Sequence, residues 1–194
     1  MAAIQLIVGL GNPGDQYSQT RHNAGFWLLD QLASRCQVAF RPEKRFHGAL
    51  AHCHSRELDC RLFKPSTFMN RSGQAVVAIT GFFDIPPEAV LVVHDELDLP
   101  PGTARLKQGG GHGGHNGLRD MISHFGGGDF YRLRLGIGHP GQRDQVVEYV
   151  LKKPSRDDRT LIEDAIADAL DVIPEIVAGQ FGRAMNMLHA RKRG

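Results

Sequence analysis

A small set of polar residues in this chain could carry out acid–base chemistry, and each stands next to glycine, at the end of an apolar run or before an expected helix. The set is His22, Asp95, Asn12, Asn70 and Asn116. An imidazole accepts and returns protons near neutral pH, and amide side chains donate and accept hydrogen bonds. The carboxyl ends of parallel strands meet at one edge of an α/β sheet, which is where such folds place their sites. We therefore expect these side chains to converge.

Each of these residues also has a purely structural interpretation. Asn70 in KPSTFMNRSG and Asn116 in GGHGGHNG precede expected helices and could be N-caps. Asp95 could cap a turn, and His22 could be an ordinary surface histidine. No serine or cysteine stands in a G-x-S-x-G nucleophile elbow. The convergence of the set favours a site, but spacing alone leaves both interpretations open.

The segment GLGNPG, residues 9–14, has the glycine spacing of a dinucleotide-binding turn. Such a turn needs a helix to begin at the glycines, but Pro13 removes a backbone N–H and DQYSQTR delays the helix. The next strand-like stretch, QVAFRPEK, offers Arg41 and Pro42 where the fingerprint needs an acidic residue. We interpret the glycines as a sharp turn that presents Asn12, and we expect no nucleotide cofactor.

Two histidine-containing segments are alternative metal sites. HCHSRELDC holds His52, His54 and Cys60, and on a strand the two histidines share a face while the cysteine between them points away. The glycine-rich loop offers a second pair, His112 and His115. Neither segment contains a C-x-x-C pair, so we expect no metal and no other cofactor.

Composition is typical of a globular chain. The 194 residues are 41% hydrophobic and 23% charged, enough to bury a core, and we expect one domain over residues 1–194. Three cysteines, Cys36, Cys53 and Cys60, argue against a disulfide framework and for a reducing compartment. The sequence shows no signal-peptide pattern and no apolar run long enough to span a membrane, so we expect a cytoplasmic protein with no membrane partner.

Alternating strand and helix patterns predict an α/β fold: a single globular domain with a mixed, largely parallel central sheet flanked by helices. Strands are expected at residues 4–8, 46–54, 60–63, 90–93, 103–108 and 131–138. Helices are expected at residues 23–36, 72–83 and 118–125 and from residue 156 onward, with Pro174 marking a kink or break. The final ARKRG is expected to be a frayed tail.

Two of these strands alternate basic and apolar residues. Arg105 and Lys107 share one face of TARLKQ, and Arg132 and Arg134 share one face of YRLRLGIG. Acidic residues concentrate on the C-terminal helix, so the formal net charge of +2 conceals a polarised surface. A basic face beside the glycine-rich loops suits phosphates, and therefore RNA or nucleotides. The alternative is an ordinary solvated face.

Five segments together resemble the successive signature blocks of bacterial peptidyl-tRNA hydrolases. They are IVGLGNPG…Y…TRHNAG, KPSTFMNRSG, VVHDELDLPPG, GGGHGGHNGLRD and RLRLGIGHPG, in the family's order from Ile4 to about Met187. Only HFGGGDFYR varies, in a loop that is variable in the family. The resemblance implies a single α/β globule, usually monomeric and metal-free. Such an enzyme cleaves the ester between a peptide and the 3′ ribose of tRNA, which recycles tRNA from stalled translation.

The resemblance also assigns roles to individual residues. His22 would be the catalytic histidine and Asp95 its partner. Asn12 would orient substrate and is the expected oxyanion donor. The other expected substrate contacts are Tyr17, Phe68, Met69, Asn70, His115 and Asn116, and the residues expected to meet tRNA phosphates are Arg105, Lys107 and Arg134.

The residue types agree with direct attack by water, because no serine or cysteine nucleophile is evident. His22 would accept the proton of the water, and Asp95 would fix the tautomer of the imidazole. The cleft is expected to offer the neutral amides of Asn70 and Asn116 and no carboxylate beyond Asp95. The alternative is a non-catalytic RNA-binding relative on the same fold, which intact His22, Asp95 and Asn12 argue against.

Overall fold

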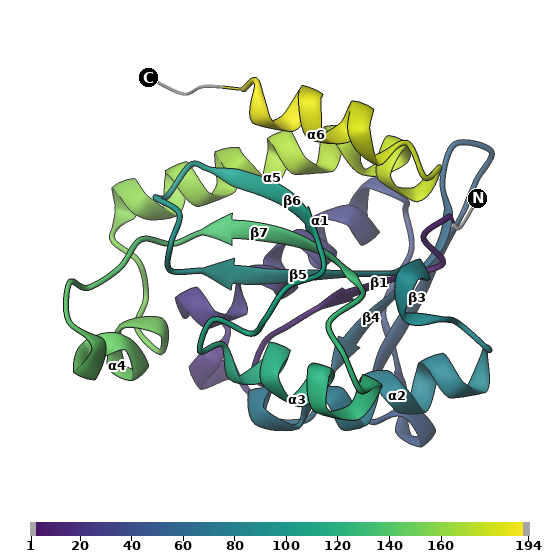
Figure 1. The fold of residues 1–194 in the computed structure, drawn as a ribbon, viewed down its shortest axis with the longest axis horizontal. Helices are drawn as coiled ribbons and strands as arrows, with labels where there is room; N and C mark the ends of the chain where they lie inside the picture. Colours follow the sequence, from purple (N-terminus) through teal and green to yellow (C-terminus); the bar gives the residue numbers. More distant parts are fainter. Residues whose placement is uncertain (1–2, 192–194) are drawn as a thin grey trace.

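The structure is a computed structural model that describes residues 3–191 (Figure 1). Within these residues one mixed sheet has the strand order β2-β3-β4-β1-β5-β7-β6. The strands are β1 Leu6–Gly9, β2 Arg41–Glu43, β3 Gly48–His54, β4 Asp59–Pro65, β5 Val90–Glu96, β6 Ala104–Gln108 and β7 Tyr131–Gly136. The central strands β4, β1, β5 and β7 are parallel, whereas β2, β3 and β6 pair antiparallel. The predicted fold class is confirmed.

Helices cover both faces of the sheet. They are α1 Ala24–Arg35, α2 Ser72–Phe82, α3 Asn116–Phe125, α4 Val146–Val150, α5 Arg156–Val177 and α6 Phe181–His189. Helices α1, α5 and α6 pack on one face, and α2 and α3 pack on the other (Figure 1). Strand β5 lies between these two layers: Leu91 and Val93 enter one core, and Val90 and Val92 enter the other. This is why its sequence is continuously apolar.

Close approach between α1 and the sheet depends on two glycines. A Cβ atom on Gly25 would lie 2.4 Å from the carbonyl oxygen of Val93, and one on Gly9 would lie 2.6 Å from the carbonyl oxygen of Gly25. Because neither residue has a Cβ, the start of α1 lies directly on β1 and β5. The helix begins at Ala24, well after the glycine turn, as the sequence predicted.

Several element boundaries differ from the predictions, and those of β5 and α5 show why. Strand β5 continues through His94 and Asp95 to Glu96, because its pairing with β7 extends that far. The predicted alternatives at Pro174 were a kink or a break, and helix α5 runs through Pro174 to Val177, so there is no break at the proline. Proline removes only one helical N–H bond, and the turn around it is held by buried Ile173 and Ile176. Helix α4 was not predicted.

The sequence argued against a disulfide framework, but two of the three cysteines form a disulfide. Cys36 follows α1 and forms a disulfide with Cys53 in β3. Cys60 is free and buried. The sequence could not reveal the pair, because the end of α1 and the end of β3 meet only when the helix packs on the sheet.

The C-terminal segment is ordered as far as it is described. Ala190 caps α6, and the guanidinium of Arg191 lies 3.1 Å from the carboxylate of Asp168. Residues 192–194 of the predicted tail lie outside the described residues. None of the helices described is both long enough and apolar enough to cross a membrane.

Candidate active site

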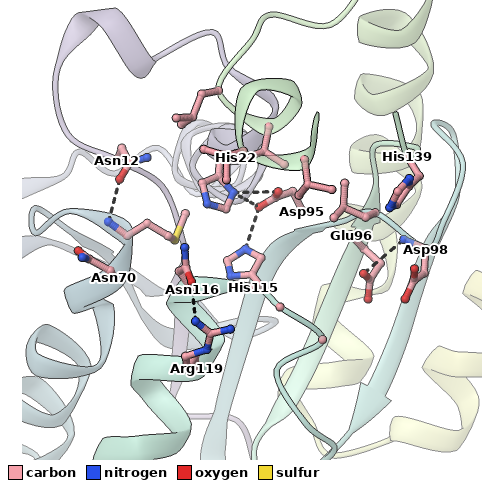
Figure 2. A pocket seen from close by; sticks show the side chains of 18 of the residues that line it. Asn12, His22, Asn70, Asp95, Glu96, Asp98, His115, Asn116, Arg119 and His139 are labelled. Carbon is pink, nitrogen blue, oxygen red and sulfur yellow. Dashed lines mark hydrogen bonds and ion pairs between the residues drawn. The ribbon is translucent and has the colours of Figure 1, made fainter. Parts of the chain in front are cut away.

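A cleft of about 470 Å³ opens at the edge of the sheet where the parallel strands end (Figure 2). It brings together most of the residues singled out from the sequence: Asn12, His22, Phe68, Met69, Asn70, Asp95, His115 and Asn116. They come from the ends of β1, β4 and β5 and from the starts of α1 and α3. The predicted convergence at one sheet edge is therefore confirmed.

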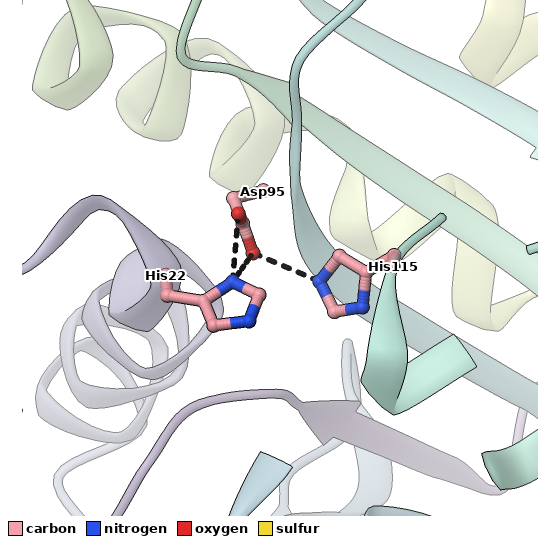
Figure 3. Close-up of side chains that lie close together, drawn as sticks. All are labelled: His22, Asp95 and His115. Atoms are coloured by element: carbon pink, nitrogen blue, oxygen red, sulfur yellow. Dashed lines mark hydrogen bonds and ion pairs between the residues drawn. The ribbon is translucent and has the colours of Figure 1, made fainter. Parts of the chain in front are cut away.

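His22 and Asp95 form a buried pair (Figure 3). The Nδ1 atom of His22 lies 3.0 and 2.9 Å from the two carboxylate oxygens of Asp95. His22 is 8% exposed and Asp95 is 3% exposed. An ionised carboxylate can only accept, so Nδ1 carries the proton and Nε2 keeps its lone pair. The interpretation of His22 as a surface histidine is wrong.

The pKa values of the pair are shifted in opposite directions. Burial disfavours the imidazolium of His22, but the charge of Asp95 and the hydrogen bond to it prevail, so the pKa of His22 is raised above 6.5. Burial also disfavours the carboxylate of Asp95, but His22 and His115 hold its pKa well below its usual range. The pair thus keeps an ionised carboxylate beside an imidazole that takes up protons readily.

His115 is the second partner of Asp95. Its Nε2 atom lies 2.9 Å from a carboxylate oxygen of Asp95. Its Nδ1 atom accepts from the backbone N–H groups of Gly117 and Leu118, at 3.2 and 3.3 Å, and so caps α3. These two bonds fix the neutral tautomer with the proton on Nε2. The sequence had offered Asn116 as the N-cap, but His115 is the cap and Asn116 is the first residue of the helix.

His94 lies behind this cluster and is neutral. Its Nδ1 donates to the carbonyl oxygen of Asp95 over 2.8 Å, and its ring packs edge-on against that of His115. Burial, more than any other influence, lowers the pKa of His94 to about 3. Its Nε2 is buried without a hydrogen-bond partner among the described residues. His94 is therefore uncharged near neutral pH and does not compete with His22 for a proton.

The side chain of Asn12 has a fixed orientation. Its Oδ1 accepts from the backbone N–H of Met69 over 2.7 Å, which identifies the oxygen and leaves Nδ2 as the free donor. The backbone of Asn12 is held by Asn23, whose Oδ1 accepts from Asn12 N–H at 2.8 Å and whose Nδ2 donates to Asn12 C=O at 3.0 Å. Asn23 was missed as a positioning residue, although it stands in the quoted block TRHNAG.

Asn70 and Asn116 are exposed at the cleft and cap no helix. Asn70 belongs to a short 3-10 turn, Met69–Arg71. The N-cap position of α2 is occupied by Arg71, whose side chain makes no capping hydrogen bond. The side-chain oxygen Oδ1 of Asn116 accepts from the guanidinium of Arg119 over 3.2 Å. Their interpretation as N-caps is therefore wrong, and both amides remain available to substrate.

The cleft contains two further carboxylates, which corrects the prediction that Asp95 would be its only one. Glu96 and Asp98 lie beyond Asp95, on the side away from Asn12, Asn70 and Asn116 (Figure 2). They were missed although they stand in the block VVHDELDLPPG. Other lining residues that the sequence did not single out are Leu97, Arg119, His139, Arg143, Val146, Val147, Val150 and Leu151.

The two aromatic residues predicted to contact substrate, Phe68 and Tyr17, lie at different places relative to the cleft. Phe68 lines the cleft and is 56% exposed. Tyr17 does not line the cleft and instead meets the ring of Phe68 edge-on, with 6.4 Å between centroids. Tyr17 thus supports the exposed ring from behind.

The basic strands lie on the part of the sheet that ends in β6. Arg105 is directly opposite Arg134 across β6 and β7, and Lys107 is opposite Arg132. Arg134 lies next to the cleft, because its guanidinium is 3.7 Å from Glu96, which lines the cleft. Arg132 differs from the other three: it is 2% exposed and donates to the carbonyl oxygens of residues 110, 111 and 128. It clamps the glycine-rich loop, so the solvated-face interpretation is wrong for Arg132.

A mixed sheet covered by helices, with a buried histidine–aspartate pair in a cleft at the sheet edge, is typical of a hydrolytic enzyme of the α/β class. The chain belongs to the peptidyl-tRNA hydrolase family, because the family model described as Peptidyl-tRNA hydrolase matches residues 6–194. Members of this family cleave the ester bond of peptidyl-tRNA, and the chain is a peptidyl-tRNA hydrolase by this relationship.

Individual relatives agree over nearly the whole chain. A peptidyl-tRNA hydrolase of Alkalilimnicola ehrlichii is 59% identical, over 97% of this chain and 96% of the relative. One of Neisseria meningitidis is 55% identical, over 97% of this chain and 98% of the relative. The crystal structure of peptidyl-tRNA hydrolase from Acinetobacter baumannii superposes with a TM-score of 0.96 at 50% identity, covering 99% of this chain and 97% of that one. The resemblance noted in the sequence is confirmed, as are the fold and the activity it implied.

Proposed function

We propose that His22 activates the water that attacks the peptidyl ester. The observation that carries this proposal is the bond from His22 Nδ1–H to Asp95, which leaves Nε2 as a proton acceptor. Water attacks the ester carbonyl while Nε2 takes its proton, and the carbonyl electrons move onto the oxygen. When the tetrahedral intermediate collapses, His22 returns the proton to the leaving 3′ oxygen of the ribose. The products are free peptide and tRNA.

Asn12 is the expected oxyanion donor. Its free Nδ2 stands in the same cleft as His22, and three hydrogen bonds to Met69 and Asn23 hold the residue in place. A fixed donor of this kind costs no reorganisation when negative charge develops, and its removal typically costs ~2.7–4 kcal/mol of transition-state stabilisation.

His115 acts on Asp95 in this proposal. Both of its ring nitrogens are engaged within the protein, so it positions the carboxylate that orients His22. The resemblance also implied that His115 contacts substrate, and this contact remains a prediction.

The acyl group is expected on the side of the cleft that carries Asn12, Asn70 and Asn116. Amide groups can donate to a peptide carbonyl and accept from a peptide N–H. Met69 and Phe68 supply apolar surface there, with Tyr17 behind Phe68. The carboxylates of Glu96 and Asp98 lie on the other side of Asp95, and Glu96 is near Arg134. Among the described residues, the acyl side therefore offers no carboxylate to pair with a free ammonium.

Phosphates of tRNA are expected to meet Arg105, Lys107 and Arg134. These cations occupy neighbouring positions on β6 and β7, and Arg134 connects them to the cleft through Glu96. A row of cations that ends at the cleft could guide the acceptor stem toward His22.

The deciding experiment compares one tRNA in two forms. N-acetyl-aminoacyl-tRNA should be hydrolysed, whereas the same tRNA carrying a free amino acid should react slower by up to ~10⁴-fold, because a site that hydrogen-bonds an acyl group leaves its polar atoms unpaired without it. Asn70→Ala and Asn116→Ala should reduce this ratio mainly by slowing the acetylated substrate. Equal kcat/KM for the two substrates would contradict the assignment of the acyl side.

We further propose a cytoplasmic monomer that acts as one domain over residues 1–194, with no metal cofactor. The family resemblance supports these features, and an ester is reactive enough to be hydrolysed without a metal. Sedimentation of the tag-free protein at assay concentration should give the mass of one chain, and activity should survive dialysis against EDTA.

A further inference from the structure

Strands β3 and β4 form an antiparallel hairpin (Figure 1). The tip of this hairpin carries a second histidine–aspartate cluster. His52 and His54 lie on one face of β3, and Asp59 stands directly opposite His54 in the antiparallel register. The Nε2 of His52 lies 2.8 Å from one oxygen of Asp59, and the Nδ1 of His54 lies 3.3 Å from the other.

We propose that His52, His54 and Asp59 bind a divalent transition-metal ion such as Zn²⁺. Their ligand atoms all lie within 4.8 Å of one another. A tetrahedral ion with bonds of ~2.0–2.1 Å needs ligand atoms roughly 3.3 Å apart, so small rotations about side-chain bonds suffice. Two imidazoles and one carboxylate are donors that Zn²⁺, Cu²⁺ and Ni²⁺ accept, whereas Mg²⁺ and Ca²⁺ prefer oxygen alone. Water would occupy the remaining position.

The cluster is free to rearrange around an ion because it is exposed. The side chains of His52, His54 and Asp59 are 44%, 78% and 59% exposed.

Asp59, rather than Cys60, completes the ligand set. The sequence had offered Cys60 beside the two histidines, but Cys60 is buried in the core and its pKa is raised to about 12 by burial. Only the thiolate binds a metal well, so this buried thiol is a poor ligand. Cys53, between the two histidines, is committed to the disulfide with Cys36.

The proposed site is remote from the cleft and independent of the proposed catalytic function. Asp59 stands at the beginning of β4, whereas Asp95 stands near the end of β5, and both strands run parallel to β1. Opposite ends of parallel strands lie at opposite edges of a sheet. An ion here would tie the two strands of the hairpin together, and binding only to the folded chain would stabilise the fold.

The test is a Zn²⁺ titration of tag-free protein in the absence of thiol reductants, followed by calorimetry. The double variant His52→Asn/His54→Asn removes two ligands from exposed positions. His124→Asn is the matched control, because His124 pairs with Asp120 on the surface at 3.5 Å but belongs to no cluster of three donors. The buried cluster at His22 is unchanged in all three proteins, so any ion it binds cancels from the comparison.

We expect wild type and the His124→Asn variant to bind one more Zn²⁺ per chain than the double variant. Added Zn²⁺ should also raise the melting temperature of those two proteins more, and ester hydrolysis should be unchanged in the double variant. Equal Zn²⁺ stoichiometry and affinity in all three proteins would overturn the proposal.

Discussion

The molecule contains two clusters of the same composition, two histidines and one aspartate, in opposite surroundings. In the cleft, the side chains of His22, Asp95 and His115 are 10%, 2% and 9% exposed. At the hairpin tip, the corresponding fractions are 44%, 59% and 78% for His52, Asp59 and His54. The nitrogen–oxygen distances are similar in both clusters, so contact geometry alone does not distinguish them.

The difference lies in what else holds each ring. Backbone N–H groups of Gly117 and Leu118 fix His115, and burial strengthens its attraction to Asp95. At the hairpin, water competes for every partner and screens the charges. The buried cluster therefore holds protons at defined atoms, whereas the exposed cluster can exchange its hydrogen bonds for an ion. Identical residue types thus suit catalysis in one place and metal binding in the other.

The largest expected difference between the two clusters appears in kcat when one histidine of each is replaced by alanine. His22→Ala should lower kcat by ~10²–10⁴-fold with tRNA affinity nearly intact, because the general base is lost but the phosphate contacts are not. His54→Ala should leave kcat unchanged. Steady-state hydrolysis of N-acetyl-aminoacyl-tRNA measures both, and near wild-type turnover in His22→Ala would refute the mechanism.

Replacing each aspartate tests the role of burial. Because the pKa of His22 is raised above 6.5, wild-type kcat/KM should rise with pH through a value above 6.5, as the imidazole loses its proton. Asp95→Asn removes the charge that raises this pKa, so the acid limb should move to lower pH while kcat falls by up to ~10⁴-fold. Asp59→Asn should change neither quantity. An unmoved acid limb in Asp95→Asn would mean that another group controls it.

Two substitutions of His115 separate its two contacts. His115→Asn keeps an N-cap acceptor for α3 but loses the bond to Asp95, so kcat should fall with stability largely kept. His115→Ala loses both and should also destabilise the fold by ~1 kcal/mol. Thermal unfolding together with kcat distinguishes them, and equal kcat in wild type and His115→Asn would show that Asp95 needs only His22.

The cations of β6 and β7 should affect tRNA binding rather than the chemical step. Substituting Arg105, Lys107 and Arg134 with glutamine should raise KM with kcat largely kept, since phosphate contacts are similar in the ground and transition states. Each lost phosphate contact should reduce the slope of log affinity against log salt by ~0.7–0.9. If KM and the salt slope of the triple variant match those of wild type, tRNA docks elsewhere.

Much of the architecture was predictable because periodicity reports which faces of an element are buried. The apolar run around Val92 and the alternation around Arg105 located strands, and the order of elements indicated a mixed sheet. Boundaries were less accurate where tertiary contacts decide them. The pairing of β5 with β7 carries the strand through Asp95, and packing around Pro174 carries α5 past the proline.

The sequence by itself determined the family, the fold class and the sheet edge at which His22, Asp95 and Asn12 meet. Those conclusions depend on local pattern and on motif order, which the chain carries in one dimension. Only the tertiary structure decided which partner each polar group takes: His115 as both cap and partner of Asp95, Glu96 and Asp98 as cleft residues, Cys36 with Cys53, and Asp59 in place of Cys60. The reason is physical. Hydrogen bonds and ligand sets act over about 3 Å, and separations that short between residues distant in sequence arise only once helices and strands have packed.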